Sequence, residues 1–403
     1  MSLGKIKPTD LAILGGPVAF SAPLPVGQLN FPEWQRFEEA MRGIFARRDY
    51  TDHGPLAQQF EAKLAEFLHV KHVVCVANAT IGLMAAAVAL GLRGKVILPA
   101  FTFIASAQSL TWAGISPVFC DVDPHTHQMD PAQAALLMNK DISAIMGVHL
   151  WGNPCFPDEF RELARDHNVP LYFDAAHAFG CTAGSKPVGN FGELEVFSFH
   201  ATKILNAAEG GCVCTNDDGL AERLRTIACI DSTERIDIPL AGNGRMSEAQ
   251  AALGLLSLED YPKVQQRNRD YHEAYRRVLG GFRGLRIQSP PSGEMSNYQY
   301  VVMEISADEF GLDRDTLWSI LHAENVISRR YFSPGIHRSY YYRDNYPEFV
   351  NSLPVTDRLC ESVMQLPSGQ DMDLEKISRV CELIWFVHRN AKALKPIARR
   401  PIR

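Results

Sequence analysis

Short apolar runs alternate with amphipathic segments along the first half of the chain. The runs are nearly continuous in apolar residues, as expected of strands that are covered on both faces. They begin at His72, Lys95, Ser116, Ala144 and Leu171. Between them lie stretches whose apolar residues recur three and four positions apart, which predicts helices. Strands and helices in alternation predict an α/β fold built on a mostly parallel sheet.

The same pattern divides the chain into three parts. Residues 1–30 are rich in Gly and Pro and predict an N-terminal arm. Residues 31–260 carry the alternation of strands and helices and predict a large domain. A long helix from Met246 leads into residues 261–403, where mixed strands and helices predict a smaller α+β domain with a basic tail, KPIARRPIR.

Composition narrows the class of protein. The net charge of −6 over 403 residues argues against a general nucleic-acid or anionic-membrane binder. No apolar run approaches the roughly 20 residues that a transmembrane helix needs, so we expect no membrane partner. The nine cysteines are scattered, several within apolar runs, and lack metal-binding spacing. They predict buried thiols, a cytoplasmic location and no metal site.

Candidate chemistry gathers in one stretch, residues 171–216. The run LYF ends in Asp174, and Lys203 closely follows a second run that ends in SFH. Ligands of open α/β sheets bind at strand ends such as these. Pyridoxal phosphate chemistry uses a lysine that forms a Schiff base and a carboxylate that keeps the pyridine nitrogen protonated. Alone, such an Asp is more often a cap and such a Lys a surface group, so the prediction depends on the combination.

The helix that follows HVVCVAN also suits this cofactor. It is predicted to begin near Asn78-Ala79-Thr80. Helix N-termini present free N–H groups and a positive dipole end, both of which favour a phosphate. An ordinary N-cap by Asn78 or Thr80 is the alternative interpretation.

Several separated motifs resemble one known family. They are FDAAHAFG, VFSFHATK with EGG after its lysine, and NGRMSEAQAALGL. In this order they resemble the DegT/DnrJ/EryC1/StrS family of pyridoxal-phosphate-dependent sugar aminotransferases, from about Pro23 to about His388. The resemblance implies the α/β fold type I of PLP-dependent transferases, the fold of aspartate aminotransferase.

The resemblance also implies roles for single residues. Lys203 and Asp174 resemble the catalytic pair, as the Schiff-base lysine and the partner of the pyridine nitrogen. His177 stands near the ring hydroxyl, where the family often has Gln, so a titratable ring replaces an amide. The other implied cofactor contacts are Ala79, Thr80 and Ser198 at the phosphate, Phe103 stacked on the ring, and Asn243 at the phosphate of the other subunit.

Candidate contacts to the acceptor lie further along the chain. They are Arg245, Tyr331, His337 and Arg338, and for each of them a surface or interface position is the alternative. Gly244, beside Arg245, stands where many family members have an aromatic residue, which changes the expected wall of the sugar pocket.

The implied function is an aminotransferase reaction. It would move an amino group from an amino acid, L-glutamate by resemblance, to a keto group of a nucleotide-linked deoxysugar such as a dTDP-4-keto-6-deoxyhexose. The alternative is a non-catalytic PLP-binding regulator of the same family. Lys203, Asp174 and Ser198 are all present and no helix-turn-helix is recognisable, which favours the enzyme. The role implied for Asn243 further predicts a homodimer with shared active sites.

Overall fold

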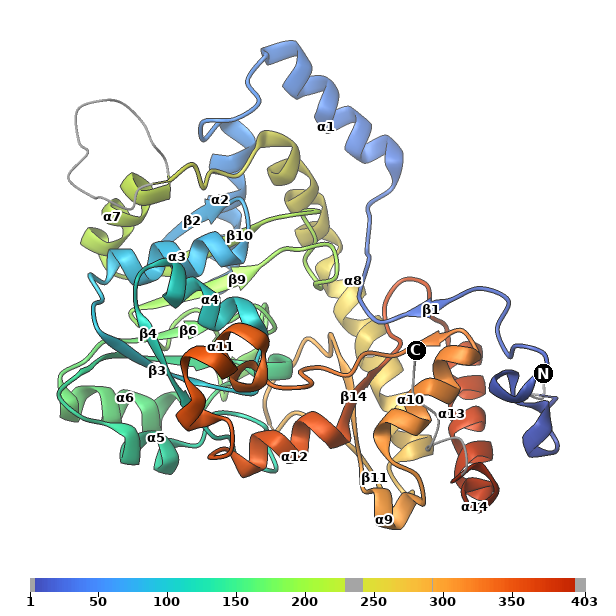
Figure 1. Cartoon of the computed structure of the whole chain (residues 1–403). Coiled ribbons are helices and arrows are strands. Elements are labelled where there is room, and N and C mark those ends of the chain that lie inside the picture. The colour runs from blue at the N-terminus through green and yellow to red at the C-terminus, as the bar shows by residue number, and fades with distance from the viewer. Residues whose placement is uncertain (1–3, 229–241, 292, 396–403) are drawn as a thin grey trace.

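Seven strands form the central sheet of the larger half of the molecule (Figure 1). The computed structural model describes residues 4–228, 242–291 and 293–395. The strand order is β2-β10-β9-β6-β5-β3-β4, and β10 alone runs antiparallel to its neighbours in this sheet. The predicted mostly parallel α/β sheet is therefore confirmed. The strands are β2 His72–Val76, β3 Lys95–Pro99, β4 Ser116–Cys120, β5 Ile142–Val148, β6 Leu171–Asp174, β9 Leu194–Ser198 and β10 Gly211–Thr215.

Helices cover both faces of this sheet, because each strand buries alternate side chains on opposite sides. In β2, Val73 packs in one core with Phe60, whereas Val74 packs in another with Leu83. The first core includes residues of α2 Pro55–Leu68, α5 Pro131–Leu137 and α6 Pro157–His167. The second includes residues of α3 Ala79–Ala89, α4 Ile104–Trp112 and α7 Asp218–Ala228.

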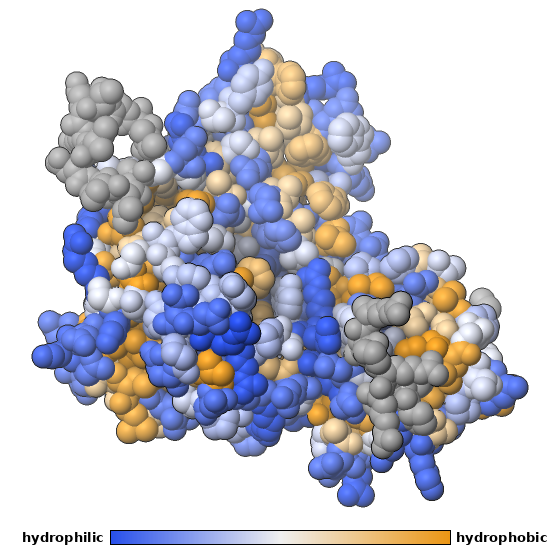
Figure 2. Space-filling view, viewed as in Figure 1, coloured by the Kyte–Doolittle hydropathy of each residue, from blue (hydrophilic) through white to orange (hydrophobic). Residues whose placement is uncertain are grey.

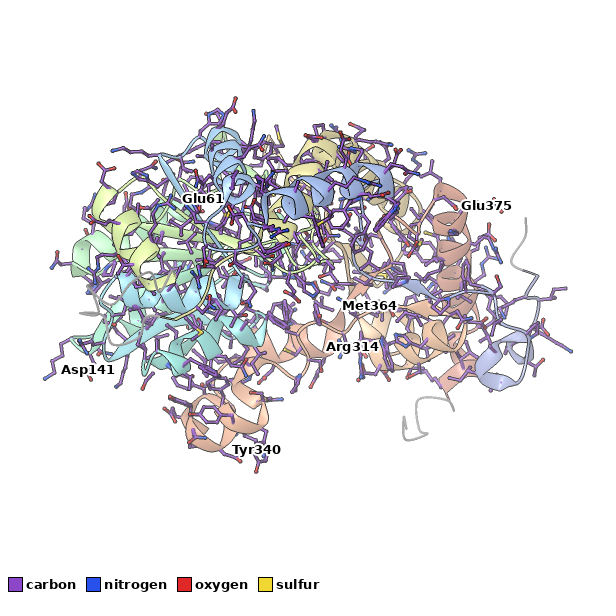
Figure 3. The ribbon with its side chains drawn as sticks, turned by 90° about the horizontal axis from the view of Figure 1, so that it is seen from above. Glu61, Asp141, Arg314, Tyr340, Met364 and Glu375 are labelled. Atoms are coloured by element: carbon purple, nitrogen blue, oxygen red, sulfur yellow. The ribbon has the colours of Figure 1, made fainter. Side chains whose placement is uncertain are left out.

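The smaller half is built on a three-stranded antiparallel sheet. Its order is β11-β12-β14. Met364 of β14 lies in the core of this half, between its helices (Figure 3). The elements are β11 Leu285–Ile287, β12 Val301–Ile305, β13 Val326–Ile327, β14 Val363–Leu366, α9 Ala307–Phe310, α10 Arg314–Ala323, α13 Leu374–Arg389 and α14 Ala391–Leu394.

One long helix, α8 Glu248–Leu279, belongs to both halves. Its Ala251 lies in the core under the large sheet, and its Tyr275 lies in the core of the smaller half. The domain boundary that we predicted between residues 260 and 261 falls inside this helix. Helix α1, Trp34–Arg47, packs against α8 and projects from the top of the molecule (Figure 1).

A segment of the smaller half returns to the larger one. Ile336 and Tyr342 pack into the core beside α3 and α4, and the exposed Tyr340 stands at the edge of the molecule (Figure 3). The helices of this excursion are α11 Tyr340–Asn345 and α12 Pro354–Ser362. Across the described parts of the chain, no helix is both long and apolar enough to cross a membrane.

The N-terminal arm is tied to the smaller half by one buried carboxylate. Glu324 accepts hydrogen bonds from the backbone N–H groups of Ala12, at 2.8 Å, and Ala19, at 2.7 Å. The same carboxylate pairs with the ammonium of Lys5 at 2.9 Å. Further along the arm, β1 Leu24–Pro25 pairs with β13 in parallel. The arm therefore packs with the smaller half before the chain enters the larger half.

We expect Glu324→Ala to release the arm. Loss of the carboxylate leaves the N–H groups of Ala12 and Ala19 without their acceptor and the ammonium of Lys5 without its counter-ion. This costs about 3 kcal/mol of folding free energy. Urea unfolding measures this loss, and limited proteolysis should find new cleavage sites within residues 4–20. Glu309→Ala is the control, because its pair with Arg283 is exposed and 3.7 Å long and contributes at most about 1 kcal/mol. Equal effects of both variants would contradict the anchoring role.

Candidate functional site

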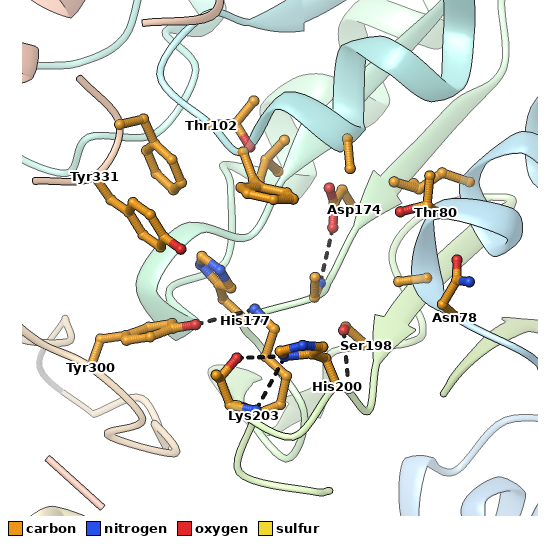
Figure 4. Close-up of a pocket in the computed structure, with 18 of the residues that line it drawn as sticks. Asn78, Thr80, Thr102, Asp174, His177, Ser198, His200, Lys203, Tyr300 and Tyr331 are labelled. Atoms are coloured by element: carbon orange, nitrogen blue, oxygen red, sulfur yellow. Dashed lines mark hydrogen bonds between the residues drawn. The ribbon is translucent and has the colours of Figure 1, made fainter. Parts of the chain in front are cut away.

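A cavity of about 280 Å³ opens where β5, β6 and β9 end and the two halves meet (Figure 4). Strand ends of the larger half supply Asp174 and Ser198 to its wall. The smaller half supplies Tyr300, Arg329, Tyr331 and Phe332. Eight of the residues predicted from the sequence line this one cavity: Ala79, Thr80, Phe103, Asp174, His177, Ser198, Lys203 and Tyr331.

One end of the cavity is built for an anion. Helix α3 begins at Ala79, and its Asn78 cap accepts a hydrogen bond from the N–H of Ile81 at 3.0 Å. The positive end of the helix dipole therefore faces the cavity, beside the hydroxyls of Thr80 and Ser198. The backbone of Gly211 packs closely against this helix N-terminus. A Cβ at position 211 would lie only 2.8 Å from the Ala79 nitrogen, so a side chain would not fit there. The arrangement suits a phosphate group.

The carboxylate of Asp174 is buried at the end of β6. Only 5% of this residue is exposed. One of its oxygens accepts from the Ser106 hydroxyl at 2.7 Å and the other from the N–H of Ala176 at 3.0 Å. Burial raises the pKa of Asp174, although these two donors and the nearby Lys203 and His149 act in the opposite direction. A buried carboxylate of this kind favours a cationic partner, such as a protonated ring nitrogen.

His177 lies beside Asp174 as a neutral ring. Burial lowers the pKa of His177 well below its ordinary value, and the nearby Lys203 lowers it further. Its ring stacks on that of Trp151 with centroids 5.7 Å apart. The Nδ1 atom is buried and has no hydrogen-bond partner within the described chain. This side chain therefore offers an unused hydrogen-bonding atom to a ligand, as expected of a contact to the ring hydroxyl.

Lys203 reaches into the cavity from the loop after β9. Its Nζ atom donates a hydrogen bond to the Tyr300 hydroxyl at 3.1 Å. Figure 4 shows Asp174 and Lys203 facing the same space, with Thr80 on one side of it and Tyr331 on the other. A flat ligand between them could meet the carboxylate, the amine and the anion site at once.

Aromatic side chains form the outer wall of the cavity. Phe103 is 49% exposed, and its ring centroid lies 6.4 Å from that of Tyr331. The guanidinium of Arg329 donates to the Tyr331 hydroxyl at 3.4 Å, so a cation lies beside this wall. The wall is therefore amphipathic, with rings that can stack on a ligand and a charge that can meet an anion.

Sequence reasoning missed Ser106, Tyr300 and Arg329. Ser106 lies in the first turn of α4, where nothing in the local pattern links it to Asp174. Tyr300 precedes a strand and looks like an ordinary core aromatic until the two halves are brought together. Arg329 is one of two adjacent arginines before Tyr331, and that local signal was available.

Two predicted acceptor contacts are engaged elsewhere. His337 is fully buried, and its Nε2 atom lies 2.9 Å from a carboxylate oxygen of Asp357. Arg338 donates to the other oxygen of Asp357 at 2.7 Å. These pairs hold the excursion around α11 and α12 together, and the structure does not bring either residue to the cavity. The turn at 336–338 directs the chain away after Tyr331.

Asn243 and Arg245 also lie outside the cavity. Asn243 lines a separate groove between α3 and α7. Arg245 pairs with Asp52 and donates to the Asn243 side chain at 3.3 Å. The role predicted for Asn243 is toward another subunit, so its position in one chain leaves that prediction in place.

The chain is similar to proteins of known activity. A sequence model of the DegT/DnrJ/EryC1/StrS aminotransferase family matches residues 33–385. The dTDP-4-amino-4,6-dideoxy-D-glucose transaminase of Shigella dysenteriae is 38% identical over 78% of this chain and 86% of its own length. The GDP-perosamine synthase of Caulobacter vibrioides is 36% identical, over 70% of this chain and 77% of its own. The structure of DesI in the presence of its TDP-sugar product superposes with a TM-score of 0.93 at 41% identity, over 97% of this chain and 100% of DesI.

The burial of Asp174 has a measurable consequence in the cofactor-free protein. Its folded-state pKa lies above the ordinary value of 3.8, so the folded state holds the proton more tightly than the unfolded state. Stability from this group is therefore lost as the pH rises above 3.8 toward the folded-state pKa. We expect the thermal midpoint of Asp174→Asn, relative to wild type, to increase from about pH 4 to about pH 7.

Asp218→Asn is the matched control for this measurement. Hydrogen bonds from Lys71 and His72 lower the pKa of the exposed Asp218 carboxyl below 3.8. Its contribution to stability is present above that value and is lost as the pH falls. The relative midpoint of this variant should therefore stay nearly constant from about pH 4 to about pH 7. Parallel trends in the two variants would show that the burial of Asp174 does not govern its titration.

Proposed function

Because the chain belongs to the DegT/DnrJ/EryC1/StrS aminotransferase family, we propose that it transfers an amino group to a nucleotide-linked ketosugar. The amino donor is an amino acid, L-glutamate, and the acceptor is a dTDP-linked 4-keto-6-deoxyhexose. The observation that supports this most directly is one cavity that holds an amine, a buried carboxylate and an anion site together. A regulator that binds the cofactor without turnover would not need Lys203 free to act inside that cavity.

The cofactor is pyridoxal 5′-phosphate, and the cavity fits it. The α3 N-terminus, Thr80 and Ser198 would hold its phosphate, and Phe103 would stack on its ring. Asp174 would face the ring nitrogen, and the orphaned Nδ1 of His177 would face the ring hydroxyl. When bound, this cofactor supplies an electron sink that makes a carbon–hydrogen bond of the substrate acidic.

The residues of the chain supply the positions and the protons. Asp174 keeps a positive charge opposite its carboxylate, because an unpaired carboxylate at this depth is unfavourable. Lys203 acts as the base, and its Nζ atom takes the proton from the α-carbon of the amino donor. The same atom returns a proton to the sugar carbon that receives the amino group. His177 would orient the cofactor ring through its hydroxyl and, because the imidazole is neutral, would add no charge beside Lys203.

The acceptor would enter past the aromatic wall. Its diphosphate is anionic, and Arg329 is the cation beside Tyr331 at that wall. The names of the relatives support a nucleotide-linked 4-amino sugar as product, and the Shigella enzyme and DesI support dTDP over GDP. We therefore retain Tyr331 as an acceptor contact and add Arg329 to it.

The functional unit in this proposal is a homodimer. Large hydrophobic side chains are exposed over α1, including Trp34, at 65%, and Phe45, at 63% (Figure 2). Trp112, which is 73% exposed, lines the same groove as Asn243. A second copy would cover these surfaces and bring Asn243 to the neighbouring phosphate.

The eight cysteines of the described residues are all buried free thiols, which supports a location in the reducing cytoplasm.

The function is tested by a panel of acceptors. Purified protein is incubated with pyridoxal phosphate, L-glutamate and a set of dTDP-, GDP- and UDP-linked ketosugars, and products are identified by NMR. We expect a dTDP-linked 4-amino-4,6-dideoxyhexose from the wild type and none from Lys203→Ala, which lacks the base. Borohydride reduction followed by peptide mapping should place the covalently bound cofactor on Lys203. A chain that binds the cofactor but converts no acceptor would favour the regulator.

Shared active sites are tested by a mixed dimer. Lys203→Ala removes the base, and Asn243→Ala removes the donor that we assign to the neighbouring phosphate, so each homodimer should be impaired. In a verified heterodimer, one of the two sites keeps both native residues, and activity should recover to about half that of one wild-type dimer. The control is a heterodimer of Lys203→Ala with Asp174→Asn, whose residues line the same cavity. Absence of recovery in both heterodimers would mean that Asn243 acts within its own chain.

A further inference from the structure

Four residues that lead into β12 pass between the cofactor loops of the larger half. We call Asn297–Tyr300 the crossing segment. The side chain of Asn297 donates to the carbonyls of His177, at 2.9 Å, and Phe179, at 3.1 Å. The crossing segment is thereby attached to the loop that follows Asp174 and carries His177.

The other end of the crossing segment holds the loop that carries Lys203. The side-chain oxygen of Gln299 accepts from the N–H of Ile204 at 2.7 Å. The hydroxyl of Tyr300 accepts from the Lys203 Nζ atom at 3.1 Å. Gln299 therefore holds the backbone directly after Lys203, and Tyr300 holds the Lys203 amine.

Tyr300 is itself rigidly placed. It is 5% exposed, and its ring meets that of His177 edge-on with centroids 4.7 Å apart. The ring of Trp151 packs against it at 5.8 Å. The carbonyl of Gln299 accepts from the side chain of Gln28 at 2.8 Å, which adds the N-terminal arm to the same support. Because the ring and the preceding backbone are held in place, the hydroxyl of Tyr300 is preorganised to accept from Lys203.

We propose that Tyr300 is a positioning residue that holds the amine of Lys203 whenever this amine is not bound to the cofactor. A free lysine side chain has several rotatable bonds and would otherwise sample the cavity. The hydrogen bond to Tyr300 keeps Nζ at one point, opposite Asp174, from which it can act on the cofactor and on the substrate carbon. This inference rests on the proposed function, which supplies the reason for a free amine during turnover.

The test is Tyr300→Phe, which keeps the ring and removes the hydroxyl. With the cofactor-free protein, we measure by absorbance how fast pyridoxal phosphate becomes covalently bound, as the Lys203 amine adds to its aldehyde carbon and water leaves. Loss of positioning should slow this capture about tenfold. Exchange of the α-hydrogen of L-glutamate with solvent should slow by a similar factor, with the KM for L-glutamate unchanged.

A double-mutant comparison separates positioning from a direct contact with the cofactor. If Tyr300 acts through the lysine, Lys203→Ala and Lys203→Ala/Tyr300→Phe should bind pyridoxal phosphate noncovalently with equal affinity. Tyr275→Phe is the matched control, because this fully buried tyrosine also donates one hydrogen bond, to the Pro367 carbonyl at 3.0 Å, within the smaller half. It should capture the cofactor at the wild-type rate.

Each result bears on the proposal. Wild-type capture by Tyr300→Phe would overturn it, and so would a lower affinity of the double variant relative to Lys203→Ala. Slowing by Tyr275→Phe to the same degree would mean that any buried hydroxyl of this half has the effect, which also overturns it. Failure of the wild type to bind the cofactor on Lys203 would instead contradict the proposed function, so the two failures are distinguishable.

Discussion

A buried carboxylate determines how the rest of the site is arranged. Asp174 ends β6, the middle strand of the seven, where the sheet is covered on both faces. One hydroxyl and one backbone N–H satisfy its oxygens but do not neutralise its charge, and burial raises the pKa of the group. Such a position is unfavourable for a carboxylate unless a cation completes it. In the proposed function, the cofactor ring nitrogen is that cation.

The second requirement is that the amine and the carboxylate keep their relative positions. The carboxylate of Asp174 lies at the end of β6, which pairs with β5 and β9, whereas the amine of Lys203 lies on the loop after β9. The crossing segment binds the loops after β6 and β9, through Asn297 on the Asp174 side and Gln299 with Tyr300 on the Lys203 side. The smaller half is therefore part of the site, because it ties together two loops of the larger half.

The elements of the fold were largely predictable from the sequence, because each depends on a local pattern. Strands covered on both faces are continuous apolar runs, and the covering helices have the period of an amphipathic helix. Residues placed directly by those elements, such as Asp174 at a strand end and Ala79 at a helix start, were therefore found from the sequence. The long helix was predicted as well, but no local pattern marks a domain boundary within it, since one continuous helix serves two cores.

Residues that reach the cavity from a distance were not predictable in this way. Tyr300 lies 97 positions after Lys203 and Ser106 lies 68 before Asp174, and no local pattern encodes either pairing. Arg338 shows the converse, because it lies close to Tyr331 in sequence but is turned away to bind Asp357. By itself, the sequence determined the strands, the helices, the family and the lysine–aspartate pair, all of which follow from local order. Only the tertiary structure decided which residues of the smaller half meet that pair, because such contacts arise from the packing of two halves.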